Sequence, residues 1–191
     1  MVLKSYIKKL VLDEEVLIAQ LKSPHTREVS YRALISEHKE RLYWHIRRIV
    51  LNHADTDDVL QNTFIKVFKN IDNFKGNSKL FSWMYRIATN EAISFLNKKA
   101  KVMHIDIQSL GEQRADGLEA DSLFDGDEIA LKLQKAIATL PQKQQLVFNM
   151  RYFDELKYKE MSEILDTSEG ALKASYHHAK KKIESYILNE Q

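Results

Sequence analysis

The chain has 191 residues, of which 29 are Lys or Arg and 27 are Asp or Glu, and its formal net charge is +2. This near balance excludes a bulk polycation and a disordered acidic tail. Five glycines, two prolines and no cysteine exclude turn-rich all-β folds, disulfide frameworks and thiolate chemistry. Because the sequence has no long apolar run and no signal-peptide pattern, we expect a cytoplasmic protein with no membrane insertion.

The charge is distributed unevenly along the chain. Residues 1–100 hold 17 basic and 11 acidic side chains, residues 101–128 hold 2 and 8, and residues 129–191 hold 10 and 8. The acidic middle segment contains three of the five glycines and lacks a periodic apolar pattern, which is typical of a flexible linker. We therefore expect an N-terminal domain over 1–100, an acidic linker over 101–128 and a C-terminal domain over 129–191.

Helical periodicity is strong in the N-terminal segment. The pattern predicts helices over residues 13–22, 27–52, 55–71 and 80–99, with an interruption of the second near Ser36 as one alternative. In the third helix, apolar positions recur every three or four residues from Val59 to Ile71. Ile65 falls outside this stripe, as an apolar side chain on an otherwise polar face.

A basic loop, NFKGNSK over residues 73–79, precedes the last of these helices. That helix places Trp83, Arg86 and Asn90 on the side opposite its apolar stripe. An aromatic ring, a cation and an amide suit stacking on nucleic-acid bases and hydrogen bonding to them. A second packing surface is the alternative, and for Trp83 we favour packing.

The C-terminal segment has the pattern of a helix-turn-helix. Helices are predicted over residues 129–139, from Pro141 to about 153, over 157–165 and over 169–188. Asp166 and Thr167 form the turn, and Ser168 is the expected N-cap of the last helix. That helix carries Lys173 and three consecutive lysines, 180–182, with no acidic residue between them. The chain as a whole is therefore expected to be all-α, with two helical domains.

Four motifs occur in a fixed order along the chain. They are DTDDVLQNTF at 55–64, FSWMYRIATN at 81–90, YKEMSEIL at 158–165 and SEGALKAS at 168–175, with Leu140-Pro141 before the third. The chain thereby resembles the extracytoplasmic-function group of bacterial sigma factors, the promoter-reading subunits of RNA polymerase, over about residues 13–188. The resemblance implies a transcription initiation factor whose partners are core RNA polymerase and promoter DNA, with an anti-sigma protein as a further partner.

The resemblance also implies roles for individual residues. One set binds the polymerase: Asp55, Asp58, Gln61, Asn62 and Ile65. A second set contacts the melted minus-ten element: Phe74, Lys75, Gly76, Asn77, Ser78, Lys79, Trp83, Arg86, Asn90 and Lys98. A third set contacts the minus-thirty-five element in the major groove: Ser168, Glu169, Lys173, Ala174, His177, His178 and Lys181.

Other interpretations remain open from the sequence. The aspartates at 55, 57 and 58 also suit simple capping of a helix, and His177 and His178 also suit an ordinary surface. The chain as a whole also fits a stand-alone helix-turn-helix regulator that acts without polymerase, or a helical adaptor that binds only protein. No glycine-rich phosphate loop, nucleophile elbow or metalloprotease helix occurs, so we expect no enzyme activity, catalytic residue, cofactor or metal.

Overall fold

The computed structural model describes residues 14–106, 109–111, 113 and 127–189. The expected all-α fold is confirmed. An N-terminal lobe contains α2 (Glu14–Lys22), α3 (Arg27–Val50), α4 (His53–Asn70), the short 3-10 helix η1 (Ile71–Asn73) and α5 (Leu80–Met103). A C-terminal lobe contains α7 (Glu128–Ala138), α8 (Gln142–Tyr152), α9 (Tyr158–Leu165) and α10 (Glu169–Asn189).

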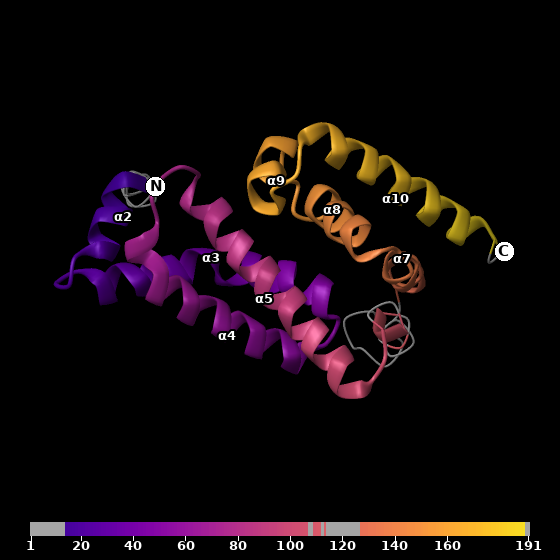
Figure 1. The fold of residues 1–191 in the computed structure, drawn as a ribbon, viewed down its shortest axis with the longest axis horizontal. Coiled ribbons are helices and arrows are strands. Elements are labelled where there is room, and N and C mark those ends of the chain that lie inside the picture. Colours follow the sequence, from indigo (N-terminus) through magenta and orange to yellow (C-terminus); the bar gives the residue numbers. More distant parts are fainter. Residues whose placement is uncertain (1–13, 107–108, 112, 114–126, 190–191) are drawn as a thin grey trace, which may run out of the picture.

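The three long helices of the N-terminal lobe pack against one another, and α2 covers one end of the group (Figure 1). Their facing apolar stripes form a closed core in which Leu34, Ile46, Met84 and Tyr85 are completely buried. The stripe predicted on α4 packs inward except at Phe68, which is 39% exposed, and Ile65 lies outside the stripe, 44% exposed. Burial of these stripes is the main term that stabilises the lobe.

Helix α3 is continuous from Arg27 to Val50, as predicted, and the alternative of a break near Ser36 is excluded. Leu34 and Leu42, on either side of Ser36, are both completely buried. One predicted boundary in this lobe is wrong. Helix α4 begins at His53 rather than Asp55, because Asn52 is its N-cap and accepts a hydrogen bond from the Asp55 backbone at 2.9 Å. The aspartates therefore lie in the first turns of α4 and do not form the cap itself.

Helix α5 is also longer than predicted and continues to Met103, so the first residues of the expected linker are helical. The helix ends at His104, which adopts a left-handed conformation with φ 55° and ψ 36°. The backbone N–H of His104 donates hydrogen bonds to the carbonyls of Ala100 and Lys101 in the last turn. Residues 114–126 of the expected linker lie outside the described residues.

In the C-terminal lobe, α10 packs on α7, α8 and α9. A small core forms between α7, α8 and α10 around Ile137, Phe148 and Ile183. The turn between α9 and α10 uses Asp166 in the left-handed region, with φ 48° and ψ 49°. Aspartate tolerates this region better than most residues, and the predicted turn is thus confirmed.

The two lobes pack directly on each other, through α8 against α3 and α9 against α5 (Figure 1). The main buried cluster is shared between them, because Val147, Met150 and Met161 of the C-terminal lobe join the core of α3 and α5. The sequence made no prediction about this arrangement.

The left-handed residue that ends α5 provides a test of the fold. His104 is exposed, so replacing it by glycine removes the steric strain of φ 55° and loses little packing. We expect His104→Gly to raise the free energy of unfolding by about 0.5–1 kcal/mol in urea denaturation. Lys101→Gly, an exposed change inside the same helix, should lower it by about 0.7 kcal/mol. Destabilisation by both changes would contradict the assigned helix end.

Candidate nucleic-acid interface

The outer face of α4 holds most of the set predicted to bind the polymerase. Asp58, Gln61, Asn62 and Ile65 are all exposed and lie along one side of the helix. Asp55 differs, because its carboxylate is half-buried and lies 2.6 Å from the ammonium group of Lys99. This ion pair ties the first turn of α4 to the end of α5, which gives Asp55 a structural contact within the lobe.

The segment between η1 and α5 presents a basic, exposed loop. Lys75, Gly76 and Asn77 face solvent, Ser78 is half-buried, and Gly76 has φ +73° with no atom near the position of a Cβ. Glycine is therefore required there by the backbone conformation and not by lack of space.

Phe74 begins this loop but is buried, with only 4% of its surface exposed. Its ring lies 5.2 Å from that of Trp83, centroid to centroid, and its carbonyl accepts a hydrogen bond from Lys22 Nζ at 2.7 Å. Trp83 is half-buried and thus packs within the lobe, as favoured above. The pair anchors the loop to α2 and α5 in this structure.

Lys79, Arg86 and Asn90, three further residues of the minus-ten set, lie at the contact between the lobes. Lys79 forms an ion pair with Glu160 at 3.1 Å, and the guanidinium of Arg86 donates a hydrogen bond to the backbone carbonyl of Glu163. Asn90 is exposed and lines a hollow between α5 and the C-terminal lobe. Lys98 is exposed further along α5. Helix α9 therefore lies against part of the face predicted to read melted DNA.

The helix-turn-helix of the C-terminal lobe leaves its second helix open to solvent. The Ser168 hydroxyl accepts a hydrogen bond from the Ala171 backbone at 3.4 Å, as expected of an N-cap. All the residues predicted to contact the minus-thirty-five element are exposed on α10 or at its start: Ser168, Glu169, Lys173, Ala174, His177, His178 and Lys181. Lys173 lies 4.0 Å from Glu169 and 5.6 Å from the ring of Tyr158. The exposed face is cationic and suits contact with phosphates.

A buried polar cluster joins the lobes, and the sequence analysis missed it. Asp154, which follows α8, lies with one carboxylate oxygen 2.8 Å from His45 Nδ1 and the other 2.9 Å from Arg48 Nη1. The second ring nitrogen of His45 lies 2.9 Å from the hydroxyl of Thr89 on α5. His45 is completely buried and the Asp154 side chain is 3% exposed. We call these four residues the interlobe cluster.

Burial and charge act in opposite directions within the interlobe cluster. Burial lowers the pKa of the Arg48 guanidinium, while the neighbouring Asp154 carboxylate raises it. A buried carboxylate is stable only when its oxygens accept hydrogen bonds, and here both oxygens have partners on α3. No local motif reveals the cluster, since Asp154 lies more than 100 residues from His45 and Arg48 in sequence.

The described residues contain no group of three His, Asp or Glu side chains arranged to hold a metal ion. None of the described helices has the length and hydropathy needed to cross a membrane.

Comparison with known families finds two matches, which lie in order along the chain. The family model "Sigma-70 region 2" matches residues 34–102, and "Sigma-70, region 4" matches residues 130–183. The first covers most of α3 together with α4 and nearly all of α5, and the second covers most of α7 to α10.

Curated proteins and solved structures agree with these matches. The chain is 28% identical to "ECF RNA polymerase sigma factor SigW" of Bacillus subtilis, over 83% of this chain and 89% of that protein. It is 23% identical to "ECF RNA polymerase sigma-E factor" of Escherichia coli K12, over 92% and 95%. In fold it is similar to CnrH in complex with the cytosolic domain of CnrY, with a TM-score of 0.68, 18% identity and coverage of 93% and 99%. It is also similar to RpoE in complex with the anti-sigma factor NepR from Bartonella quintana, with a TM-score of 0.64, 18% identity and coverage of 84% and 98%.

The interlobe cluster generates a prediction about stability. In Asp154→Asn the guanidinium of Arg48 stays in the interface without its counter-charge, and His45 loses a carboxylate acceptor. We expect the free energy of unfolding in urea to fall by about 2–3 kcal/mol. Glu155→Gln makes the same chemical change at the exposed neighbouring residue and should change it by less than about 0.5 kcal/mol. Equal effects of the two changes would show that the cluster does not hold the lobes together.

Proposed function

Because this chain belongs to the extracytoplasmic-function group of bacterial RNA polymerase sigma factors, we propose that it binds core RNA polymerase and directs it to specific promoters. It reads two promoter elements and promotes melting of the DNA at the downstream one. The observation that carries this proposal is that a single chain holds both sigma-70 regions, region 2 over the N-terminal lobe and region 4 over the C-terminal lobe.

Docking on the polymerase is assigned to the outer face of α4. The exposure of Asp58, Gln61 and Asn62 around the apolar Ile65 supports this, since a partly exposed isoleucine among polar residues suits a partner surface. Asp55 is assigned an indirect role, because its ion pair with Lys99 holds the start of α4 in place.

Recognition of the minus-thirty-five element is assigned to α10. The N-terminal residues of a recognition helix reach base edges, and lysines further along hold phosphates. Ser168 and Glu169 lie at the N-terminal end of α10, where side chains reach base edges. Lys173 and Lys181 lie further along, where lysines hold phosphates. These four residues are exposed although the lobes are packed together. This supports a DNA-binding site on α10 that is available before the lobes separate.

Recognition of the minus-ten element is assigned to the loop at 74–79 and the adjoining face of α5. Lys79 and Arg86 cannot contact DNA while they bind Glu160 and the Glu163 carbonyl. The proposal therefore includes a separation of α9 from α5 when the polymerase and the promoter bind. Capture of unstacked bases by the freed face would then favour the melted state by a few kcal/mol.

The proposed cellular location and further partner follow from membership of the same family. The protein acts in the cytoplasm and is not an enzyme, and an anti-sigma protein is proposed as a further partner because a relative of similar fold is described in complex with one. The stand-alone regulator is not favoured, because such a protein needs no region 2.

Run-off transcription tests the proposal. Core polymerase from a bacterium that carries this chain is supplied with a genomic promoter library, with and without the protein. Transcripts that appear only with the protein would establish the function and yield the promoter motif. Absence of both transcripts and binding to the polymerase would overturn the proposal in favour of a regulator that binds DNA alone.

The docking face generates a prediction. The double change Asp58→Lys and Gln61→Lys replaces one negative and one neutral exposed side chain by two positive ones. It should weaken association with core polymerase at least tenfold, while circular dichroism and the unfolding midpoint stay unchanged. Lys69→Glu, at the exposed end of the same helix, serves as a control for charge reversal and should have a smaller effect. Unchanged association of the double variant would remove α4 as the docking helix.

The recognition helix generates another prediction. Each lysine that neutralises a phosphate contributes about one unit to the salt dependence of DNA binding. Lys173→Ala with Lys181→Ala should therefore lower the slope of log affinity against log salt by about two units, measured for the holoenzyme on promoter DNA. Lys143→Ala removes an exposed lysine of α8, outside the recognition helix, and should leave the slope unchanged. If the double variant keeps the original slope, α10 is not the helix that contacts the phosphates.

A further inference from the structure

A groove of about 580 Å³ lies between the lobes, next to the interlobe cluster. One wall is formed by α3 over residues 37–48, and the other by residues 153–155, which follow α8. We call it the interlobe groove. Because each lobe provides one wall, an occupant of the groove contacts both lobes.

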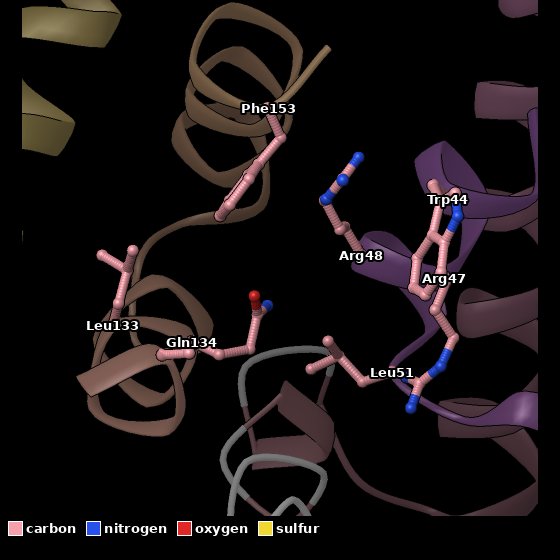
Figure 2. A pocket seen from close by; sticks show the side chains of 8 residues that line it. Trp44, Arg47, Arg48, Leu51, Leu133, Gln134 and Phe153 are labelled. Carbon is pink, nitrogen blue, oxygen red and sulfur yellow. The ribbon is translucent and has the colours of Figure 1, made fainter. Parts of the chain in front are cut away.

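The side chains that line the interlobe groove are already packed against one another. Figure 2 shows Arg48 of α3 between the rings of Trp44 and Phe153. The Arg48 guanidinium lies 4.6 Å from the centre of the Phe153 ring, and its Nη1 lies 2.9 Å from the Asp154 carboxylate. The groove is therefore an open surface that suits a segment of polypeptide, and it is not a closed pocket for a small molecule.

Three exposed carboxylates border the interlobe groove, those of Glu37, Glu40 and Glu155. None of the three forms an ion pair within the described part of the chain. Arg41 also lines the groove, but its guanidinium is held 4.2 Å from the centre of the Phe81 ring. Unpaired carboxylates around aromatic side chains favour an occupant that is both basic and apolar.

Residues 1–13 lie outside the described residues and have the composition that the groove favours. Their sequence is MVLKSYIKKLVLD, with three lysines and one acidic residue. The apolar residues recur at the spacing i, i+3, i+4 and i+7, at Leu3, Tyr6, Ile7 and Leu10. The lysines at 4, 8 and 9 fall outside this stripe. An apolar stripe with a positive charge is complementary to the aromatic rings and carboxylates of the groove.

This N-terminal segment joins the described chain close to the groove. Glu14, the first described residue, accepts a hydrogen bond at 2.7 Å from the first backbone N–H of α5. Burial lowers the pKa of the His38 imidazole, and the charges near enough to act on it are those of Glu37, Arg41 and Glu14. Glu14 therefore lies near the end of the groove that Glu37 borders. Thirteen residues span about 20 Å as a helix and about 43 Å when extended, whereas residues 37–48 of α3 are about 17 Å long.

We propose that residues 1–13 bind in the interlobe groove of the same chain. The apolar stripe packs on Trp44 and Phe153, and the three lysines pair with the carboxylates of Glu37, Glu40 and Glu155. Because the segment contacts both lobes, its binding favours their closed arrangement. Binding in the groove is a property of the free chain, and only its effect on the opening that transcription requires rests on the proposed function.

Zero-length cross-linking of the full chain tests the contact without the polymerase. A carbodiimide couples a lysine amine to a carboxylate that it touches and leaves no spacer. In an equal mixture of nitrogen-14 and nitrogen-15 chains, mass spectrometry should find the lysines at 4, 8 or 9 joined to Glu37, Glu40 or Glu155 of the same isotope. Cross-links between isotopes would place the segment of a second copy in the groove and overturn the proposal, as would the absence of cross-links to the groove.

Charge exchange provides a second test. The chain has two tryptophans, so Trp83→Phe leaves Trp44 as the only one, and acrylamide quenching of its fluorescence then reports whether the groove is covered. In this background, the triple change Lys4→Glu, Lys8→Glu and Lys9→Glu should raise the quenching constant at least twofold. The opposite triple change, Glu37→Lys, Glu40→Lys and Glu155→Lys, should have the same effect. The two sets combined should restore the original quenching constant.

A matched control separates this contact from a general effect of charge. Lys143→Glu with Lys180→Glu and Lys182→Glu makes the same change in net charge at exposed lysines that do not line the groove, and should leave the quenching constant unchanged. Circular dichroism establishes that each variant is folded. Equal quenching in the N-terminal and control variants, or no restoration in the combined variant, would overturn the proposal.

Discussion

The carboxylate of Asp154 lies between His45 and Arg48 of α3, and this contact decides how the two halves of the molecule are arranged. Each lobe has an apolar surface of its own, and α8 and α9 bury theirs against α3 and α5. Apolar burial is not directional, so many relative orientations would satisfy it about equally well. The two hydrogen-bonded oxygens of Asp154 favour one orientation, because any other packing that buries this carboxylate leaves it without partners.

That orientation has a consequence for the DNA-reading surfaces. The recognition helix α10 stays open to solvent, while α9 covers part of the α5 face and binds Lys79 and Arg86. These two contacts lie at the surface and contribute little stability individually. The closed arrangement therefore depends on the buried contacts around Asp154 and the shared core. A partner that separates the lobes must supply binding free energy that exceeds the stabilisation given by these contacts.

Much of the fold follows from local sequence patterns, because helical periodicity and turn chemistry act over a few residues. The stripe from Val59 to Ile71, the exposed Ile65 and the left-handed Asp166 are all where the pattern predicts them. Asp55 and Phe74 show where prediction from local sequence patterns ends. The ion pair of Asp55 with Lys99 and the packing of Phe74 on Trp83 depend on how helices meet, which no local pattern specifies. The interlobe cluster is the extreme case, since Asp154 is separated from His45 by more than 100 residues.

The measurement that tests this account most directly is the distance between the lobes. The chain contains no cysteine, so cysteines introduced at the exposed Lys69 of α4 and Lys180 of α10 would be the only sites for a pair of fluorescent labels. We predict that energy transfer in the free protein reports a single distance, and that adding core polymerase with promoter DNA shifts the population to a different, longer one. A distance that stays the same in the transcribing complex would contradict the claim that the lobes must separate.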